Sequence, residues 1–168
     1  MALSIVTSLA IRATLANYSF TETPLIKWPN DIYYTDRKIA GSLIEIEAES
    51  NGYTRVIIGV GINVNMCQAN KKEIDQTWTS MQLGLEEPVD RSQLCAELIN
   101  QLTNHLQQFE QQGDAPFIAQ WSEYDYLKDH QISLIAYDKK ITGIAKGINQ
   151  FGHLCICLLY TSDAADEW

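Results

Sequence analysis

The sequence predicts an α/β (α+β) fold, in which a mixed, largely antiparallel sheet packs against helices and a small β-module follows near the C-terminus. Apolar residues recur at helical spacing near the N-terminus and again after residue 90, which is typical of amphipathic helices. Short apolar runs joined by turn residues lie between and after these segments, as expected for antiparallel strands. A chain of 168 residues is long enough for one domain, or for one domain with a small appendage.

The first elements follow from spacing and from turn residues. A helix is expected from Leu3 to Ala16, because its apolar residues share one face. Pro24 then breaks the chain, and a short strand is expected at 25–28. Residues 29–31 supply turn chemistry and lead into a second strand at 32–34.

Two longer strands are expected next. Apolar and polar residues alternate along 38–48, which follows a hairpin connection at 35–37. Residues 49–52 have the composition of another hairpin turn. The run RVIIGVGI at 55–62 is almost wholly apolar, which predicts a central strand that is buried on both faces.

The second half of the chain changes character. Residues 63–75 are expected to form a polar loop. Asp90 then opens a helix whose apolar face runs from Leu94 to Phe109, and Gly113 ends it. Asp114 can cap a further helix, with Pro116 tolerated in its first turn. Three short strands are expected after that helix, at 132–137, 141–147 and 153–159.

Composition excludes several classes of protein. The net charge of −9 argues against a nucleic-acid-binding surface, which needs a dense basic stripe. The apolar stretch Met1–Ile11 is too short to span a bilayer and lacks a preceding basic region, so a cytoplasmic protein without membrane contact is expected. The cysteines form no CxxC pair and the histidines have no zinc-ligand spacing, which favours free thiols in a reducing compartment.

The stretch KWPNDIYYTDRKIAG, at 27–41, concentrates polar groups between apolar strands. A lysine on a strand, here Lys38, is suited to stabilise an anion, and Gly41 removes a side chain where a ligand can approach the backbone. The alternative from residue types alone is a solvated hairpin with charged tips. Lys27 and Arg37 are interpreted as structural or surface residues.

The stretch GVGIN, at 59–63, is not a dinucleotide-binding fingerprint, because the third glycine and the helix that it should open are absent. Two glycines in a strand instead permit close backbone approach. Asn63 at the strand end has an amide that can bind a base or a phosphate. Adjacent antiparallel strands would bring this stretch and Lys38 onto one face of the sheet.

KWPNDIYYTDRKIAGSLIE followed by VIIGVGINVN resembles the biotin protein ligase family, over roughly residues 3–156. The resemblance implies a class II synthetase-like biotin/lipoate ligase fold with a C-terminal SH3-like module. It implies an enzyme that forms biotinyl-5′-AMP from biotin and ATP with Mg²⁺, and then transfers biotin to a lysine of a biotin carboxyl carrier protein. Physically, the first step needs cations where two anions meet.

The resemblance also implies roles for single residues. Lys38 would be the catalytic residue, in contact with the biotin carboxylate and the α-phosphate. Asn30, Asp31 and Asn63 would contact ATP or the adenylate, and Asp31 would orient Lys38 or hold Mg²⁺. Trp78 falls in the segment that covers the adenylate in this family, with a core or surface tryptophan as the alternative. The floor of the biotin pocket would consist of Gly41, Leu43 and Gly59.

The sequence departs from the family in lacking a GRGRxGR-type segment before KWPND and a winged-helix domain. The expectation is a chain truncated at the N-terminus and again at the C-terminus, which is weakly active or inactive alone. The expected division is the C-terminal part of a catalytic domain at 1–126, a partial SH3-like domain at 127–157 and a non-native tail at 158–168.

Two other functions stay open on the sequence. One is a lipoate or octanoate ligase or transferase of the same fold, and the other is an inactive ligand-binding fragment. A homodimer is also possible, because family members extend the central sheet edge to edge, and the exposed edge is expected near Glu49–Tyr53.

Overall fold

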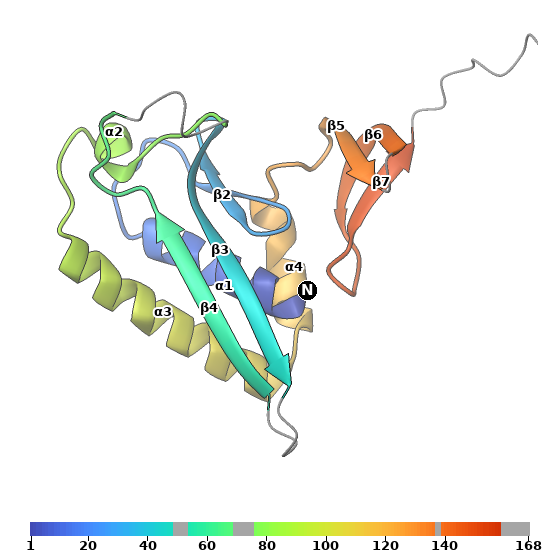
Figure 1. The fold of residues 1–168 in the computed structure, drawn as a ribbon, viewed down its shortest axis with the longest axis horizontal. Helices are drawn as coiled ribbons and strands as arrows, with labels where there is room; N and C mark the ends of the chain where they lie inside the picture. The colour runs from blue at the N-terminus through green and yellow to red at the C-terminus, as the bar shows by residue number, and fades with distance from the viewer. Residues whose placement is uncertain (49–53, 69–75, 137–138, 159–168) are drawn as a thin grey trace, which may run out of the picture.

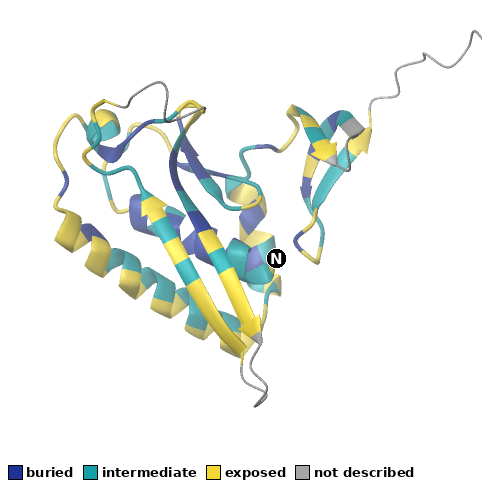
Figure 2. Ribbon diagram, viewed as in Figure 1, coloured by how far each residue is buried: buried dark blue, intermediate teal, exposed yellow. Residues whose placement is uncertain are grey.

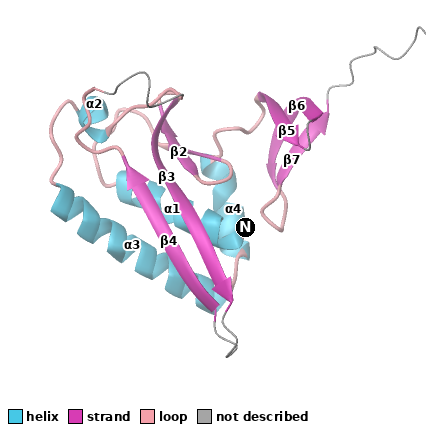
Figure 3. Cartoon of the chain, in the orientation of Figure 1, coloured by secondary structure: helices cyan, strands magenta, loops and turns pink. Residues whose placement is uncertain are grey.

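The computed structural model describes residues 1–48, 54–68, 76–136 and 139–158 (Figure 1). Within these ranges the chain forms two sheets and several helices (Figure 3). The elements in order are α1 (Ala2–Leu15), β1 (Leu25–Lys27), β2 (Asp31–Tyr34), β3 (Arg37–Ala48), β4 (Thr54–Ile62), α2 (Met81–Leu85), α3 (Arg91–Gln112), α4 (Ala115–Tyr124), β5 (Gln131–Ala136), β6 (Lys139–Ile148) and β7 (Leu154–Leu158).

The larger sheet has the strand order β1-β2-β3-β4, and every neighbouring pair is antiparallel. Two isolated parallel bridges, Ile26 with Asp125 and Lys38 with Trp78, join later segments to it. The smaller sheet is the antiparallel set β5-β6-β7. A largely antiparallel sheet with packed helices and a C-terminal β-module confirms the predicted fold class.

The core lies between the larger sheet and α1, α3 and α4, which cover one side of it (Figures 1 and 2). The predicted first helix is confirmed, and it is buried on most sides because strands and two helices surround it. Leu9 on this helix, Ile39 on β3 and Trp121 on α4 are among the buried side chains. Each such side chain contributes about 1.5–3 kcal/mol through burial.

The connection between β2 and β3 is a two-residue hairpin loop, since Tyr34 pairs with Arg37. Thr35 and Asp36 have φ values of 48° and 61°. Positive φ at both central positions belongs to a type I′ turn, which matches the twist of the strands. Asp tolerates this conformation, so the predicted hairpin connection is confirmed.

The prediction for residues 55–62 is wrong in one respect. They form β4, but this strand lies at the end of the described sheet, and Val56 and Ile57 are exposed by 39% and 46%. Helices cover only the end of the β3–β4 ribbon near Ile62, and no other described strand pairs with the outer edge of β4. An apolar run predicts a strand that can be buried, while burial itself depends on distant neighbours.

The predicted boundaries of α3 are confirmed. Asp90 Oδ1 accepts hydrogen bonds from Ser92 N at 2.8 Å and Gln93 N at 3.2 Å, and Gly113 closes the helix. Asp114 does occupy the N-cap position of α4, with Pro116 in the first turn, but its side chain makes no capping bond. Its backbone is already helical at φ −89° and ψ −20°, so the carboxylate does not turn back over the helix start.

The β-module follows α4 through a segment tied to the larger sheet. Tyr126 N donates to Ile26 O at 2.9 Å, and the Tyr126 hydroxyl donates to Asp36 Oδ1 at 3.1 Å. The division of the chain at residue 126 stays a prediction, and residues 159–168 of the predicted tail lie outside the described residues. Among the described helices, none combines the length and apolar character that crossing a bilayer requires.

Candidate functional site

A cavity of about 560 Å³ opens on the face of the larger sheet where β2, β3 and β4 meet. Seven of the eight predicted site residues line it, and Trp78 is the exception. The seven are Asn30, Asp31, Lys38, Gly41, Leu43, Gly59 and Asn63. Their convergence follows from strand pairing, although their chemical roles stay predictions.

The register of the strands explains this convergence. Asp31 on β2 lies opposite Gly41 on β3, and Gly41 lies opposite Gly61 on β4. Leu43 lies opposite Gly59 two residues further along. Alternate residues of a strand share a face, so these positions lie on one face of the sheet. They form the floor of the cavity, where the three glycines contribute no side chain.

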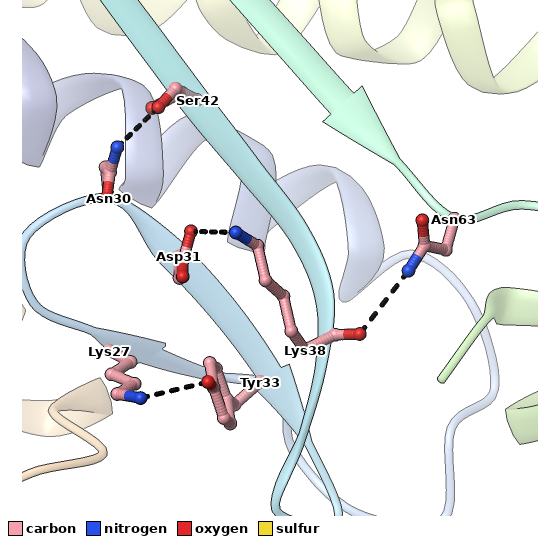
Figure 4. A network of polar contacts seen from close by, with 7 residues as sticks. All are labelled: Lys27, Asn30, Asp31, Tyr33, Lys38, Ser42 and Asn63. Carbon is pink, nitrogen blue, oxygen red and sulfur yellow. Dashed lines mark hydrogen bonds and ion pairs between the residues drawn. The ribbon is translucent and has the colours of Figure 1, made fainter. Parts of the chain in front are cut away.

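Lys38 reaches across this floor to Asp31. Its Nζ atom lies 2.7 Å from Asp31 Oδ1, with the two side chains exposed by 27% and 22% (Figure 4). Both groups therefore keep contact with solvent while they form a short charge-assisted bond. The ammonium is placed at the rim of the cavity with one anionic partner, which an incoming anion can replace.

Gly41 makes room for this ion pair. A Cβ atom at this position would lie 2.6 Å from Asp31 Oδ1, 3.1 Å from Lys38 Cε and 3.3 Å from Lys38 Nζ. Any side chain here would force the carboxylate or the lysine to move. Glycine is thus required by the pair itself, in addition to any ligand.

Gly59 and Gly61 have a different environment. A Cβ on Gly59 would lie 3.6 Å from Leu43 O, an ordinary contact, and one on Gly61 would have nothing within 4 Å. The space above β4 is therefore open. A flat apolar group could lie against this backbone without displacing protein atoms.

Asn30 is fixed to β3 by two hydrogen bonds. Its Nδ2 atom donates to Ser42 O at 2.5 Å, and Ser42 N donates to Asn30 O at 3.0 Å (Figure 4). The turn that precedes Asp31 is thus locked in place. The second hydrogen of Nδ2 and the amide oxygen Oδ1 are the Asn30 atoms left for the predicted adenylate contact.

Asn63 braces the end of β4. Its Nδ2 atom donates to Lys38 O at 3.4 Å (Figure 4). The same atom donates to Thr79 O at 2.9 Å, and the backbone N of Asn63 donates to Ile39 O at 2.9 Å. The amide nitrogen predicted to bind a nucleotide is thus engaged with the protein. It holds the backbone of Lys38 against the segment that leads into α2.

Trp78 lies beside Lys38 through its backbone. Lys38 N donates to Thr77 O at 3.1 Å, and Thr79 N donates to Lys38 O at 2.9 Å. The Trp78 side chain is half-buried and does not line the cavity. The predicted role of Trp78 in covering an adenylate stays a prediction.

The structure adds residues that the sequence did not single out. Ser42 contributes the carbonyl that fixes Asn30, and nothing in its sequence context signals this. Gly61, the second of the two glycines noted in GVGIN but given no ligand role from the sequence, lines the cavity together with Gly59. Lys27 donates to the Tyr33 hydroxyl at 2.9 Å, and Arg37 is exposed, which agrees with structural and surface roles.

Comparison with known proteins relates this fold to one family. Residues 2–63 match the model of the Biotin/lipoate A/B protein ligase family. This family is the one that the chain resembles over these residues, and the solved structures that share its fold are biotin protein ligases.

Two curated relatives illustrate these similarities. The chain is 39% identical over 132 residues to the bifunctional ligase/repressor BirA of Salmonella typhimurium, and 38% identical over 132 residues to that of Escherichia coli. The alignments cover 78% of this chain in both cases, and 41% and 40% of the relatives. The chain thus spans about two fifths of the length of the curated relatives that it matches.

Solved structures agree on the fold. The apo biotin protein ligase of Aquifex aeolicus has a TM-score of 0.81 at 23% identity, covering 94% of this chain and 68% of that one. The same protein in complex with biotin and ATP has a TM-score of 0.80 at 24% identity, covering 93% and 64%. At these identities the likeness supports the fold, while chemistry must be argued from the site.

Proposed function

We propose that this site serves an ATP-dependent biotin protein ligase, which forms biotinyl-5′-AMP and transfers biotin to a lysine of a biotin carboxyl carrier protein. The observation that carries the proposal is the placement of Lys38 at the end of a glycine floor, 2.7 Å from Asp31 and beside an open cavity. A flat apolar ring system fits the floor, and its carboxylate would extend toward the ammonium.

The first proposed step joins two anions. A carboxylate oxygen of biotin attacks the α-phosphorus of ATP, and pyrophosphate leaves. Lys38 would exchange Asp31 for the ligand oxygens, because an ammonium stabilises charge that accumulates there. The second step replaces AMP by the amine of the acceptor lysine, which loses a proton as the amide forms.

Mg²⁺ is proposed as a companion of ATP. The described residues contain no group of three or more His, Cys, Asp or Glu side chains arranged to hold a metal. This suits Mg²⁺, which proteins usually bind through one or two carboxylates together with substrate phosphates. Asp31 is the residue that would hold it, since its carboxylate lines the cavity. When bound, the metal neutralises phosphate charge.

The lipoate or octanoate reaction is not favoured, because the similar solved structures described above are biotin protein ligases by name. Weak or absent activity of the chain alone stays a prediction. So does a cover formed by Trp78. The four cysteines are free, which supports the proposed cytoplasmic location.

A homodimer that extends the sheet is also still a proposal. The edge predicted for it, Glu49–Tyr53, lies outside the described residues. The described part of β4 nevertheless has an outer edge without a described partner strand, and exposed apolar residues next to it.

The test is biotin-dependent ATP–pyrophosphate exchange in the full-length protein, with Lys38→Ala and a matched control, Arg37→Ala. Both variants lose one positive charge on neighbouring residues, but Arg37 is exposed outside the cavity. Loss of Lys38 should lower exchange by about 10²–10³-fold, while Arg37→Ala should stay within about twofold. Full exchange by Lys38→Ala, or an equal loss in both variants, contradicts the proposal.

Binding provides a second measure that does not need turnover. Titration calorimetry with biotin and with lipoate should detect biotin binding only. Binding of lipoate alone, or of neither ligand, contradicts the proposed ligand for this chain.

A further inference from the structure

We infer that the C-terminal β-module is part of the machinery of this site, because Trp28 and the turn Asn149–Gly152 act together as positioning residues for Asn30 and Asp31. The inference rests on the proposed function in so far as Asn30 and Asp31 contact the nucleotide. The physical coupling that it describes is independent of any ligand.

The link is one hydrogen bond between parts of the chain that are far apart in sequence. Trp28 Nε1 donates to Gly152 O at 3.1 Å across 124 residues. The indole ring is half-buried and packs against the main hydrophobic core. An indole has a single donor, so this bond is what satisfies it in a partly buried position.

The turn that accepts this bond is held by hydrogen bonds of its own. Asn149 Oδ1 accepts from Phe151 N at 2.9 Å and from His153 N at 3.0 Å, and Gly152 N donates to Asn149 O at 2.9 Å. These bonds fix the position of the Gly152 carbonyl within the turn. Trp28 therefore meets an acceptor whose place is set before the bond forms.

The turn is also pressed against α1. Gly152 has a φ of +77°, and a Cβ there would lie 2.6 Å from Ile5 Cδ1. Only glycine combines that backbone conformation with this close approach. The acceptor carbonyl is thus held in a fixed position relative to α1.

On the other side of the bond, Trp28 begins the turn that carries the site. Ser4 Oγ on α1 donates to Pro29 O at 2.7 Å, and Asn30 is tied to Ser42 on β3 as described above. The turn therefore has three anchors, which come from α1, β3 and the β-module. Asp31, which pairs with Lys38, is the residue directly after the last anchored position.

The remainder of the interface makes this contact more important. A cavity of about 470 Å³ separates the β-module from the larger sheet, with Tyr126, Leu134 and Leu154 among its lining residues. Trp28 forms part of its wall. At this cavity the bond to Gly152 is how Trp28 reaches the β-module, while elsewhere Ile148 on β6 packs against the main core.

The test uses Trp28→Phe, which removes the donor and keeps an aromatic ring, and Asn149→Ala, which loosens the turn and keeps the indole. Phe151→Ser is the matched control, since this side chain lies in the same turn and is 62% exposed. Two NMR signals report the state of the site turn. They are the hydrogen exchange of the Ser42 amide and the resonance of the Asn30 side-chain amide, and both atoms belong to the bonds that join Asn30 to Ser42.

Trp28→Phe and Asn149→Ala should each speed hydrogen exchange of the Ser42 amide about five- to tenfold. They should also shift the Asn30 side-chain amide signal. Exchange of the β3 amides beyond Leu43 should not change in these variants, and the control Phe151→Ser should change neither signal. The double variant should add nothing to the larger single effect, because both substitutions break the same contact.

Unchanged Ser42 exchange, equal acceleration along all of β3, or additive effects would each overturn the inference. If Trp28→Phe does not fold, Asn149→Ala decides alone, because it leaves the half-buried indole ring in place. No biotin or ATP is present in the measurement. A chain that fails to bind biotin would therefore disprove the proposed function and leave this coupling measurable.

Discussion

Lys38 carries the central role in the proposed chemistry, and its position depends on atoms from several neighbours. Asp31 holds the ammonium, Gly41 leaves space for the side chain, and Asn63 and Thr79 bind the backbone. The RKIAG pattern predicted a functional lysine next to a glycine. The pattern could not predict that Gly41 makes room for the ion pair, because Asp31 lies on β2 and meets Gly41 only through the pairing of β2 with β3.

Substitution of Gly41 by Ala should break the pair and preserve the fold. The new Cβ would lie 2.6 Å from Asp31 Oδ1, and the carboxylate is the end of a flexible side chain that can move away. Because both charges are partly exposed, the loss in unfolding free energy should be below about 1 kcal/mol. The NMR signal of the Lys38 ammonium should become the same as in Asp31→Asn.

Gly59→Ala is the matched control, since its Cβ would make only an ordinary contact at 3.6 Å from Leu43 O. It should leave the ammonium signal unchanged. A Gly41→Ala variant with an unaltered ammonium signal would show that the glycine does not serve the pair.

At the scale of elements, the cavity floor is a property of the β3–β4 ribbon. Glycines on β4 and Gly41 on β3 lie opposite or beside one another because the register places them on one face. Alternation within each strand was visible in the sequence. The register was not, because it is set by the hairpin at residues 49–53 and by packing over the whole ribbon.

Gly61→Val should remove ligand binding and leave stability almost unchanged. The valine would stand in space with no protein atom within 4 Å of its Cβ, inside the cavity. A β-branched residue also suits a strand. Biotin affinity measured by calorimetry should fall at least about tenfold, which is about 1.4 kcal/mol.

Ile57→Val is the control for Gly61→Val. It lies on the same face of β4, is 46% exposed and does not line the cavity. Its affinity should match that of the unmodified chain. If Gly61→Val retains full affinity, the ligand does not lie on this floor.

Helices and strands with strong periodicity were predicted well, and short or context-dependent features were not. The helix α3 has a capping aspartate and a closing glycine, so both ends were visible in the sequence. The five-residue helix α2 was missed, because one turn gives no periodicity. The exposure of β4 was missed because an apolar run looks the same in the middle and at the edge of a sheet.

At the scale of the whole molecule, Tyr126 joins the segment before the β-module to the sheet. Burial raises the pKa of its phenol above the ordinary value of 10.0, and the hydrogen bond to Asp36 raises this pKa further. The sequence predicted the β-module and the hairpin separately. Nothing in it linked Tyr126 to Asp36, which lie 90 residues apart.

The raised pKa of Tyr126 gives stability a definite pH dependence. A phenol whose pKa is higher in the folded state stabilises the fold below the unfolded value, and this contribution is lost as the pH rises through the folded pKa. The chain should therefore lose stability above pH 10.0 more steeply than Tyr126→Phe does.

Ultraviolet titration of the tyrosines, with Tyr126→Phe as the reference for subtraction, measures this ionisation directly. In Asp36→Asn the pKa should be lower than in the unmodified chain, though still raised by burial. An unchanged titration in Asp36→Asn would show that the hydrogen bond does not contribute.

The ion pair of Lys38 with Asp31 has a kinetic consequence. The pair has no net charge, and the chain as a whole carries −9, so an approaching anion meets an overall repulsive field until it displaces the carboxylate. Added salt weakens long-range repulsion between exposed charges much more than it weakens a contact at 2.7 Å. Association of an anionic ligand with this chain should therefore speed up with ionic strength, opposite to the behaviour of a site that attracts its ligand from a distance.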